Sequence, residues 1–221
     1  MNDIVAIYKE KGPTSHDIIY RLRKITGVKR IGHAGTLDPL AEGVLIVGVG
    51  RDATKKLGIE VQKEKEYLTT IMLGVTSSTD DEEGEKTSIA VKSIPTQKEV
   101  EEAVKSFVGK IKQVPPIFSA VKVQGKEAYK FARKGRTVEL EAREVEIKKI
   151  EIIDYQWPLL TIKVVSGPGV YIRALGKDIG KKLGVGGGYL KYLKRTRVGE
   201  YSCDHALTLG QFEKLYLKIN V

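Results

Sequence analysis

The sequence predicts an α+β fold, in which a mixed, mainly antiparallel sheet is flanked by helices and loops. Three observations support this fold class. Short apolar or alternating runs typical of strands recur along the chain, amphipathic segments with capping residues lie among them, and the two kinds do not follow the strand–helix–strand rhythm of a parallel sheet. The chain has 221 residues, of which 41% are hydrophobic, so it can bury a substantial core.

The clearest strand is the apolar run GVLIVGVG at residues 43–50, because a strand that is buried on both faces is apolar throughout. Segment 66–75 is also expected to be a strand. It leads into SSTDDEEGEKTS (77–88), an acidic, turn-rich segment that we expect to be a mobile loop. Further strands are expected at residues 4–9, 137–153, 159–166 and 189–201, with a short one near the end of segment 112–125.

Helices are expected where a capping residue precedes apolar residues at helical spacing. Ser15 or Thr14 can cap a helix that continues to about Ile25. Segment 96–108 begins at a threonine with a glutamate three positions later, which is the pattern of a capping box. Further helices are expected at residues 126–135, 171–184 and 207–218.

Composition narrows the classes of protein. No apolar run approaches the roughly 20 residues of a membrane-spanning helix. The N-terminus is too short and too polar for a signal peptide. Cys203 is the only cysteine in the sequence, which excludes an intramolecular disulfide and a cysteine metal cluster. We therefore expect a cytoplasmic protein in a reducing compartment.

The charge of the chain points to a polyanionic partner. The net charge of +10 and the pI of about 9.4 are typical of proteins that bind nucleic acid. A lysine-rich surface that is merely solvated is the alternative interpretation.

One nucleotide-binding motif can be set aside. GVGRDA (48–53) fits the dinucleotide fingerprint, but that motif needs an acidic residue at the end of the next strand. Strand 66–75 ends in Gly and Val, and we expect the helix after GVGRDA to be very short. The sequence also contains no P-loop and no HExxH zinc motif.

The segment GHAGTLDPLAEG (32–43), within a loop expected at residues 31–43, is the strongest candidate for chemistry. Asp38 precedes a proline, which favours an extended backbone, and the glycines let the chain approach a neighbour closely. Together they fix one carboxylate at the mouth of the buried strand. An Asx turn or a helix cap is the alternative role for this side chain. Glu42 lies four residues further on, so a carboxylate pair for acid–base hydrolysis is another alternative.

These residues carry a resemblance to a known family. GHAGTLDPLAEGVL (32–45) resembles GHxGTLDPxAxGxL, the catalytic motif of the bacterial tRNA pseudouridine synthase B (TruB) family. Other motifs of the family follow in the same order, at residues 11–17, 65–74, 114–135, 166–184 and 189–199. The resemblance extends from about residue 4 to about residue 212.

The resemblance implies a pseudouridine-synthase sheet and an RNA isomerase that acts in tRNA processing. Such an enzyme converts uridine 55 in the T loop of tRNA to pseudouridine: the N1–C1′ bond breaks, the base rotates, and C5 bonds to C1′. The base must first be flipped out of its stack. The resemblance implies no cofactor and no metal, and we expect a monomer whose partner is the T stem-loop of tRNA.

Three residues match the family's catalytic set. Asp38 matches its essential aspartate, and the sequence leaves open whether this carboxylate adds to C6, attacks C1′ or removes a ribose proton. Arg173 matches the active-site arginine, which would lie beside Asp38 and keep it ionised against the effect of burial. Tyr67 matches the tyrosine whose ring stacks on the uracil and whose hydroxyl lies near C5. From the residues alone, Arg173 also fits a surface helix, and Tyr67 also fits a half-buried strand.

The resemblance also implies a substrate-binding set. His33 would contact RNA around the extruded nucleotide, although an ordinary loop histidine is the alternative. Lys9 would lie near the pocket and support the motif at residues 11–17, and Glu10 replaces the proline that usually follows it. Leu193 would pack against the base, and Tyr171 belongs to the same set.

Phosphate contacts are expected from two groups of cations, because phosphates position RNA on a protein without reading its sequence. The groups are Lys126, Lys130, Arg133, Lys134 and Arg136 in the insertion, and Lys191, Lys194, Arg195 and Arg197 on the last strand. The last four alternate poorly, so not all of them can face one side. A solvated basic face is the alternative for each of these residues.

We expect a catalytic domain at residues 1–212, with an RNA-gripping insertion at about 113–142, and a tail at 213–221. No PUA-type RNA-binding domain fits after residue 212, which indicates a short form or a truncated chain.

Two other functions compete with this interpretation. The first is a non-catalytic RNA-binding module on the same scaffold, which would have no need for Asp38, Tyr67 and Arg173 together. The second is the catalytic subunit of a guide-RNA-directed complex, whose members normally carry the extra C-terminal domain.

Overall fold

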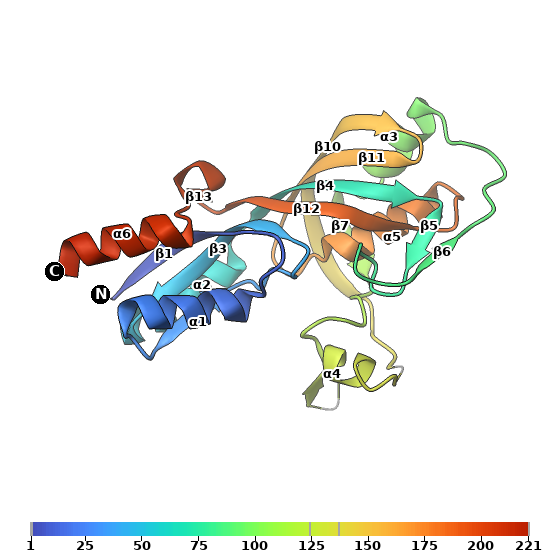
Figure 1. The fold of residues 1–221 in the computed structure, drawn as a ribbon. Helices are drawn as coiled ribbons and strands as arrows, with labels where there is room; N and C mark the ends of the chain where they lie inside the picture. The colour runs from blue at the N-terminus through green and yellow to red at the C-terminus, as the bar shows by residue number, and fades with distance from the viewer. Residues whose placement is uncertain (1, 124, 137, 221) are drawn as a thin grey trace. The chain divides into compact units, whose positions relative to one another are not determined.

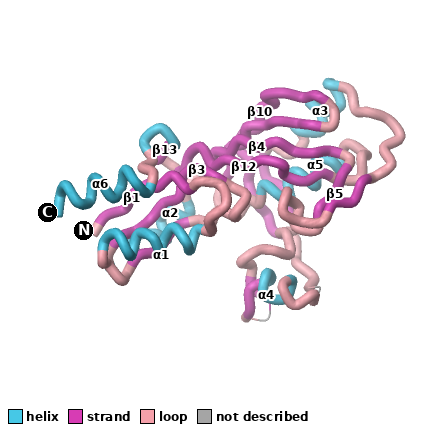
Figure 2. The backbone as a smooth tube through the Cα atoms, viewed as in Figure 1, coloured by secondary structure: helices cyan, strands magenta, loops and turns pink. Residues whose placement is uncertain are grey.

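The computed structural model describes residues 2–123, 125–136 and 138–220. Contacts within the chain divide it into two compact units: unit 1 comprises Met1–Leu68 and Leu193–Val221, and unit 2 comprises Thr69–Tyr192. The division falls within the strands β4 (Lys65–Leu73) and β12 (Gly188–Val198). Each of these two strands therefore contributes residues to both units. Figures 1 and 2 show the helices and strands of each unit.

Unit 1 is built around β3 (Glu42–Val49), in which every residue after Glu42 is buried. β1 (Asp3–Lys9) and β2 (Ile31–Ala34) both pair with β3 antiparallel, and β12 pairs with it in parallel. The apolar run predicted at residues 43–50 therefore forms the central strand of this unit.

β2 corrects the loop that was expected at residues 31–43. Ile31 and Ala34 are buried, and pairing with β3 satisfies main-chain groups that a loop would leave unpaired in such a place. Only the part after Ala34 is irregular, and this shorter loop contains Asp38.

In the described part of unit 1, the α-helices are α1 (Ser15–Thr26), α2 (Arg51–Gln62) and α6 (Leu209–Asn220). Thr14 caps α1 through a capping box, because its hydroxyl accepts from the main-chain N–H of Asp17 while the Asp17 carboxylate accepts from that of Thr14. The predicted cap is therefore confirmed. The chain after β12 also forms β13 (Tyr201–Ser202) and the 3-10 helix η1 (Cys203–His205).

α2 is a helix of 12 residues, so the very short helix predicted after GVGRDA is wrong. Ala53 and Leu57 give it a buried apolar face. At its C-terminal end the buried Lys65 side chain donates to the carbonyls of Val61 and Lys63, which a helix end would otherwise leave unsatisfied. The next strand still ends without an acidic residue, which argues against dinucleotide binding.

Unit 2 has the strand order β12-β4-β11-β10-β7. The long strand β10 (Arg143–Gln156) is antiparallel to β11 (Leu159–Ser166) on one side and to β7 (Gly109–Gln113) on the other. The strand predicted at residues 137–153 therefore begins only at Arg143, and residue 137 lies outside the described residues.

Two small hairpins accompany this sheet. Their strands are β5 (Val75–Ser77) with β6 (Lys86–Ser88), and β8 (Lys122–Val123) with β9 (Lys126–Glu127). The first hairpin corrects the mobile loop predicted at residues 77–88. Asp80 and Asp81 in its connection are buried, and the Leu190 N–H donates to the carbonyl of Asp80.

The helices of unit 2 are α3 (Gln97–Lys105), α4 (Ala128–Ala132) and α5 (Ile172–Lys182). Thr96 and Glu99 form the predicted capping box of α3. α4 and the β8–β9 hairpin form the insertion, which projects away from the sheet of unit 2 (Figure 1).

The predicted fold class is confirmed, since helices flank a mixed sheet in which antiparallel pairs predominate. Within the described ranges, no helix is both long enough and apolar enough to cross a membrane.

The capping box of α3 gives a stability prediction. Thr96→Ala removes the hydroxyl that accepts from the N–H of Glu99, and we expect the free energy of unfolding to fall by about 1 kcal/mol. Urea unfolding followed by circular dichroism measures the change. Thr87→Ala, at an exposed threonine of β6, is the control. Equal effects of the two substitutions would contradict the role of the cap.

Candidate functional site

The loop that contains Asp38 is held by buried side chains from elsewhere in unit 1. The Lys9 ammonium donates to the carbonyl of Ala41 at 2.6 Å and to that of Pro39 at 3.4 Å. The Ser15 hydroxyl donates to the carbonyl of Leu37 and accepts from its N–H, at 3.0 and 2.9 Å. These contacts fix the main chain on both sides of Asp38, whose side chain is half-buried.

Lys9 was expected to contact substrate, and the structure indicates a different role. Its side chain is fully buried, and its ammonium donates to three main-chain carbonyls, those of Glu10, Pro39 and Ala41. A group without solvent exposure cannot reach RNA in this conformation. Lys9 therefore positions the Asp38 loop.

Glu42 at the start of β3 interacts with Tyr8. Burial, followed by the negative charge of Glu42 and a hydrogen bond to it, raises the pKa of Tyr8 to about 12. Glu42 is therefore engaged with the neighbouring strand, and the hydrolytic pair with Asp38 gains no support from this contact.

His33 lies in β2 and packs against His16 of α1. The two rings meet edge to face, with centroids 5.4 Å apart and planes at 88°. Burial, together with the positive charges of His16 and Arg195, lowers the pKa of His33 to about 4. The ring is therefore neutral near pH 7, and it offers a flat surface rather than a positive charge.

Arg173 lies in the first turn of α5, in unit 2, and is buried, so the alternative of a surface helix arginine is wrong. Its guanidinium donates to the carbonyl of Thr79 at 3.0 Å and to that of Phe118 at 2.8 Å. A carboxylate oxygen of Asp81 lies 3.8 Å from Nη1. These contacts fix the guanidinium and satisfy part of its hydrogen-bonding capacity.

Asp81 and Gln113 are residues that the sequence analysis missed. Asp81 is buried beside Arg173, and it also accepts hydrogen bonds from Thr79 and from the N–H of Glu83. The buried Gln113 amide pairs with both main-chain groups of Tyr171, at 2.9 and 3.2 Å, and so sets the start of α5. In the sequence, Asp81 is part of the acidic segment TDDEEG, and such a segment predicts side chains that are exposed to solvent.

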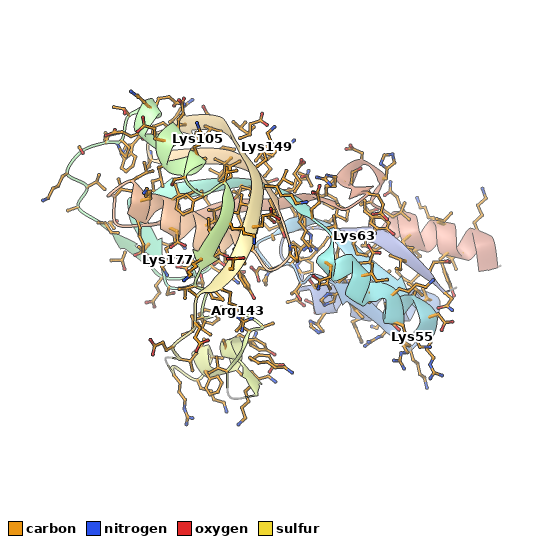
Figure 3. All side chains as sticks on the ribbon, turned by 180° about the vertical axis from the view of Figure 1, so that it is seen from behind. Lys55, Lys63, Lys105, Arg143, Lys149 and Lys177 are labelled. Carbon is orange, nitrogen blue, oxygen red and sulfur yellow. The ribbon has the colours of Figure 1, made fainter. Side chains whose placement is uncertain are left out.

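The neighbouring Asp80 is tied to α5 as well. The Lys177 ammonium lies 3.1 Å from its carboxylate, and Figure 3 labels this lysine. Asp80 has a positive φ of 60°, which is uncommon for a residue other than glycine. The connection between β5 and β6 is thus built around two carboxylates that face cations of α5.

Tyr67 of β4 and Leu193 of β12 are both buried, with 8% and 5% of their surfaces exposed. Buried and partly buried residues alternate along β4, so Tyr67 lies on the buried face of a half-buried strand, as considered from the residues alone. The contacts of these two side chains with a uracil ring stay predictions.

The insertion presents its cations to solvent. Lys126, Lys130, Arg133, Lys134 and Arg136 are all exposed. Lys130 pairs with Glu127 at 2.8 Å, and the Arg133 guanidinium lies 5.4 Å from the centre of the Tyr129 ring. This surface is basic and contains an aromatic ring, a combination that is common in proteins that bind single-stranded nucleic acid.

The last strand does not present four cations to RNA. Lys191 is exposed, and the Lys194 ammonium lies over the Tyr8 ring at 5.5 Å. Arg197 pairs with Glu64 at 2.7 Å. Arg195 is buried and donates to main-chain carbonyls, so the phosphate contact predicted for it is wrong.

The sequence matches family descriptions over most of its length. Residues 23–172 match the N-terminal domain of the TruB family pseudouridylate synthases, and residues 173–220 match the tRNA pseudouridylate synthase B C-terminal domain. The chain belongs to the TruB family of pseudouridylate synthases. The family inferred from the motifs is therefore confirmed, and with it the class of RNA isomerases.

Similar curated proteins carry the same family name. The tRNA pseudouridine synthase B of Mycobacterium sp. (strain KMS) is 45% identical over 210 residues, which are 93% of this chain and 70% of the relative. The protein of that name from Thermobifida fusca (strain YX) is 44% identical over 216 residues, which are 94% of this chain and 73% of the relative.

Solved structures share the fold. A chain in the structure of an H/ACA RNP bound to a substrate RNA containing 2′-deoxyuridine has a TM-score of 0.71 at 25% identity, over 96% of this TruB-family chain and 53% of that chain. A chain of a Cbf5-Nop10-Gar1 complex has a TM-score of 0.73 at 27% identity, over 96% and 54%. The present chain thus spans about half the length of the solved chains that it matches.

The lowered pKa of His33 gives a prediction for the dependence of stability on pH. Its folded pKa of about 4 lies below the ordinary value of 6.5, so the unfolded state binds the proton first as the pH falls. Stability should therefore decrease between about pH 6.5 and 4, and His33→Phe should remove part of this decrease. Melting temperatures at pH 7 and pH 4.5 measure it.

His205→Phe, at an exposed histidine of η1, is the control for this measurement. If both variants lose stability in acid as steeply as the wild type, burial of a neutral His33 is not the cause. An NMR titration of the His33 ring tests the same pKa directly.

Proposed function

We propose that this protein isomerises uridine 55 in the T loop of tRNA to pseudouridine, with Asp38 acting on the flipped-out nucleotide. The observation that carries this proposal is the Asp38 loop, whose main chain is fixed on both sides of the carboxylate by Lys9 and Ser15. The loop occurs in a chain that is 45% identical to proteins named tRNA pseudouridine synthase B. In this family, a carboxylate that is held in position can act on the nucleotide.

The reaction needs no outside reagent. The N1–C1′ bond breaks and a C5–C1′ bond forms, while C5 loses a proton and N1 gains one, so atoms and electrons balance within the nucleotide. No oxidant, reductant or activated group enters the equation. Catalysis therefore depends on positioning and on a charged group at the reacting atoms, and we propose that no cofactor is required.

Asp38 acts in its ionised form in each of the three routes that the sequence left open. A water-poor site would raise the pKa of a carboxyl group and neutralise it, so a fixed cation is needed nearby. We assign this role to Arg173, because its guanidinium is already held by the carbonyls of Thr79 and Phe118. A guanidinium stays protonated and can hold a carboxylate through two hydrogen bonds.

The remaining site residues contact the extruded base and the RNA around it. Tyr67 provides a flat ring and a hydroxyl near C5, and Leu193 and Tyr171 provide apolar contact. His33 is neutral and half-buried, so it suits stacking at the position that the base vacates.

Binding energy for flipping comes from contacts away from the base. Flipping costs a few kcal/mol. The exposed cations of the insertion, Lys126, Lys130, Arg133 and Arg136, can recover this cost through phosphate contacts along the T stem. The cytoplasm is the corresponding compartment, and one copy of the chain suffices for the site.

A guide-RNA-directed function is the second candidate, because the similar solved chains come from an H/ACA RNP and a Cbf5-Nop10-Gar1 complex. Those chains are 25% and 27% identical, whereas the proteins named tRNA pseudouridine synthase B reach 45%. The higher identity favours direct action on tRNA.

The first functional prediction concerns Asp38. The wild-type protein alone should convert the T-loop uridine of an unmodified tRNA transcript, as chemical mapping of pseudouridine would show. Asp38→Asn should abolish turnover, because the amide has no negative charge, and should leave tRNA affinity within a few fold. Glu42→Gln is the matched control and should remain active. Tight tRNA binding by the wild type without product would leave only an RNA-binding module.

The second functional prediction concerns Arg173 and Asp81. Arg173→Lys should lower the single-turnover rate on the order of 100-fold, because lysine cannot hold a carboxylate bidentately. Asp81→Asn removes the carboxylate 3.8 Å from Nη1 and should cost about tenfold, or about 1.4 kcal/mol. Rates at saturating tRNA measure both. Glu85→Gln, at an exposed position of the same hairpin, should leave the rate unchanged. Equal rates for all three variants would refute the assignment.

A further inference from the structure

Arg195 of β12 is a fully buried cation whose hydrogen-bond acceptors are main-chain carbonyls. Only 2% of its surface is exposed. Nε donates to the carbonyl of Val44 and Nη2 to that of Gly35, both at 2.8 Å. Burying a guanidinium is costly unless its N–H groups find acceptors, so the position of Arg195 and the positions of these two carbonyls depend on each other.

The two carbonyls lie at opposite ends of the Asp38 loop. Gly35 is the first residue after β2, and Val44 lies near the start of β3. One planar guanidinium therefore joins the point where the loop leaves one strand to the point where it enters the next. Lys9 and Ser15 hold the loop between these ends, at Leu37, Pro39 and Ala41.

The backbone of the loop is shaped to accept this side chain. Gly35 has a φ of 74°, and a Cβ atom there would lie 3.3 Å from Nη1 of Arg195. Gly43 has a φ of 110°, and a Cβ atom there would collide with the main-chain carbonyl of Arg195. Both positions favour glycine for conformational and for steric reasons. The loop and Arg195 thus fit each other at two separate points.

We propose that Arg195 is a positioning residue for the isomerisation: it fixes both ends of the loop that carries Asp38, and it does not touch the RNA. The inference rests on the proposed function, in which Asp38 is the acting carboxylate. Release of either end of the loop would let that carboxylate move. A displacement of about 1 Å is sufficient to cost about 100-fold in rate.

The experiment compares variants that differ in how they can hold the two carbonyls. Arg195→Met keeps much of the apolar stem and removes every donor. Arg195→Lys keeps the charge but replaces the planar fork with a single ammonium, which cannot reproduce the two-point hold. Val198→Ala truncates a buried residue of the same strand that belongs to one core cluster with Ala34 and Val44, at the two ends of the loop. It removes no hydrogen-bond donor, and so serves as a control for lost packing near the loop and for general destabilisation.

Each variant is assayed for melting temperature, for tRNA affinity by filter binding, and for the single-turnover rate at saturating tRNA, well below its melting temperature. We expect Arg195→Met to lose about 100-fold in rate while its tRNA affinity changes by less than about threefold. Arg195→Lys should fall between Arg195→Met and the wild type. Val198→Ala should keep the wild-type rate, although its melting temperature is lower.

Several results would overturn the inference. These are a wild-type rate for Arg195→Lys and Arg195→Met, a rate loss in Val198→Ala as large as theirs, or a loss of tRNA affinity that accounts for the loss of rate. If Arg195→Met does not fold, the comparison between Arg195→Lys and Val198→Ala decides. Absence of product from the wild type would instead refute the proposed function itself, which the Arg195 variants cannot do.

Discussion

Buried cations that hydrogen-bond to loop carbonyls are the constraint on which the candidate site residues of each unit depend. A loop that is packed against a core has main-chain carbonyls that no strand or helix satisfies, and a buried ammonium or guanidinium needs acceptors. The cation supplies donors to the carbonyls, and the carbonyls supply acceptors to the cation. In unit 1, Lys9 and Arg195 bind the carbonyls of the Asp38 loop. In unit 2, Arg173 binds those of Thr79 and Phe118.

This arrangement makes irregular segments as well defined as regular ones. Hydrogen bonds that involve a charged group contribute about 1.5–3 kcal/mol each, more than bonds between neutral groups. Loss of one cation also leaves its former acceptors buried and unsatisfied. The loops therefore have one strongly preferred conformation, which a catalytic carboxylate needs. Lys9 and Arg195 also bring positive charge close to the segment that carries Asp38.

What the sequence could predict follows from how local each signal is. β3 and the capping box of α3 were predictable, because an apolar run and a Thr–Glu pair act on their own neighbours. Asp38 and Arg173 were found through motifs. Arg195 was misread as a phosphate contact, because its acceptor at Gly35 lies 160 residues away in the sequence. Asp81 was misread as solvated, because an acidic segment gives no sign that a distant guanidinium will face it.

The replacement of the usual proline by Glu10 shows how such a contact tolerates change. The Lys9 ammonium donates to the main-chain carbonyl of Glu10 at 3.0 Å and does not use the Glu10 side chain. Proline would offer the same carbonyl, since it lacks only the N–H. Lys9 itself is placed by β1, whose register sets it opposite Gly43 of β3. The position of the ammonium therefore depends on the sheet and on carbonyl groups that any residue supplies, so the substitution leaves the hold on the Asp38 loop intact.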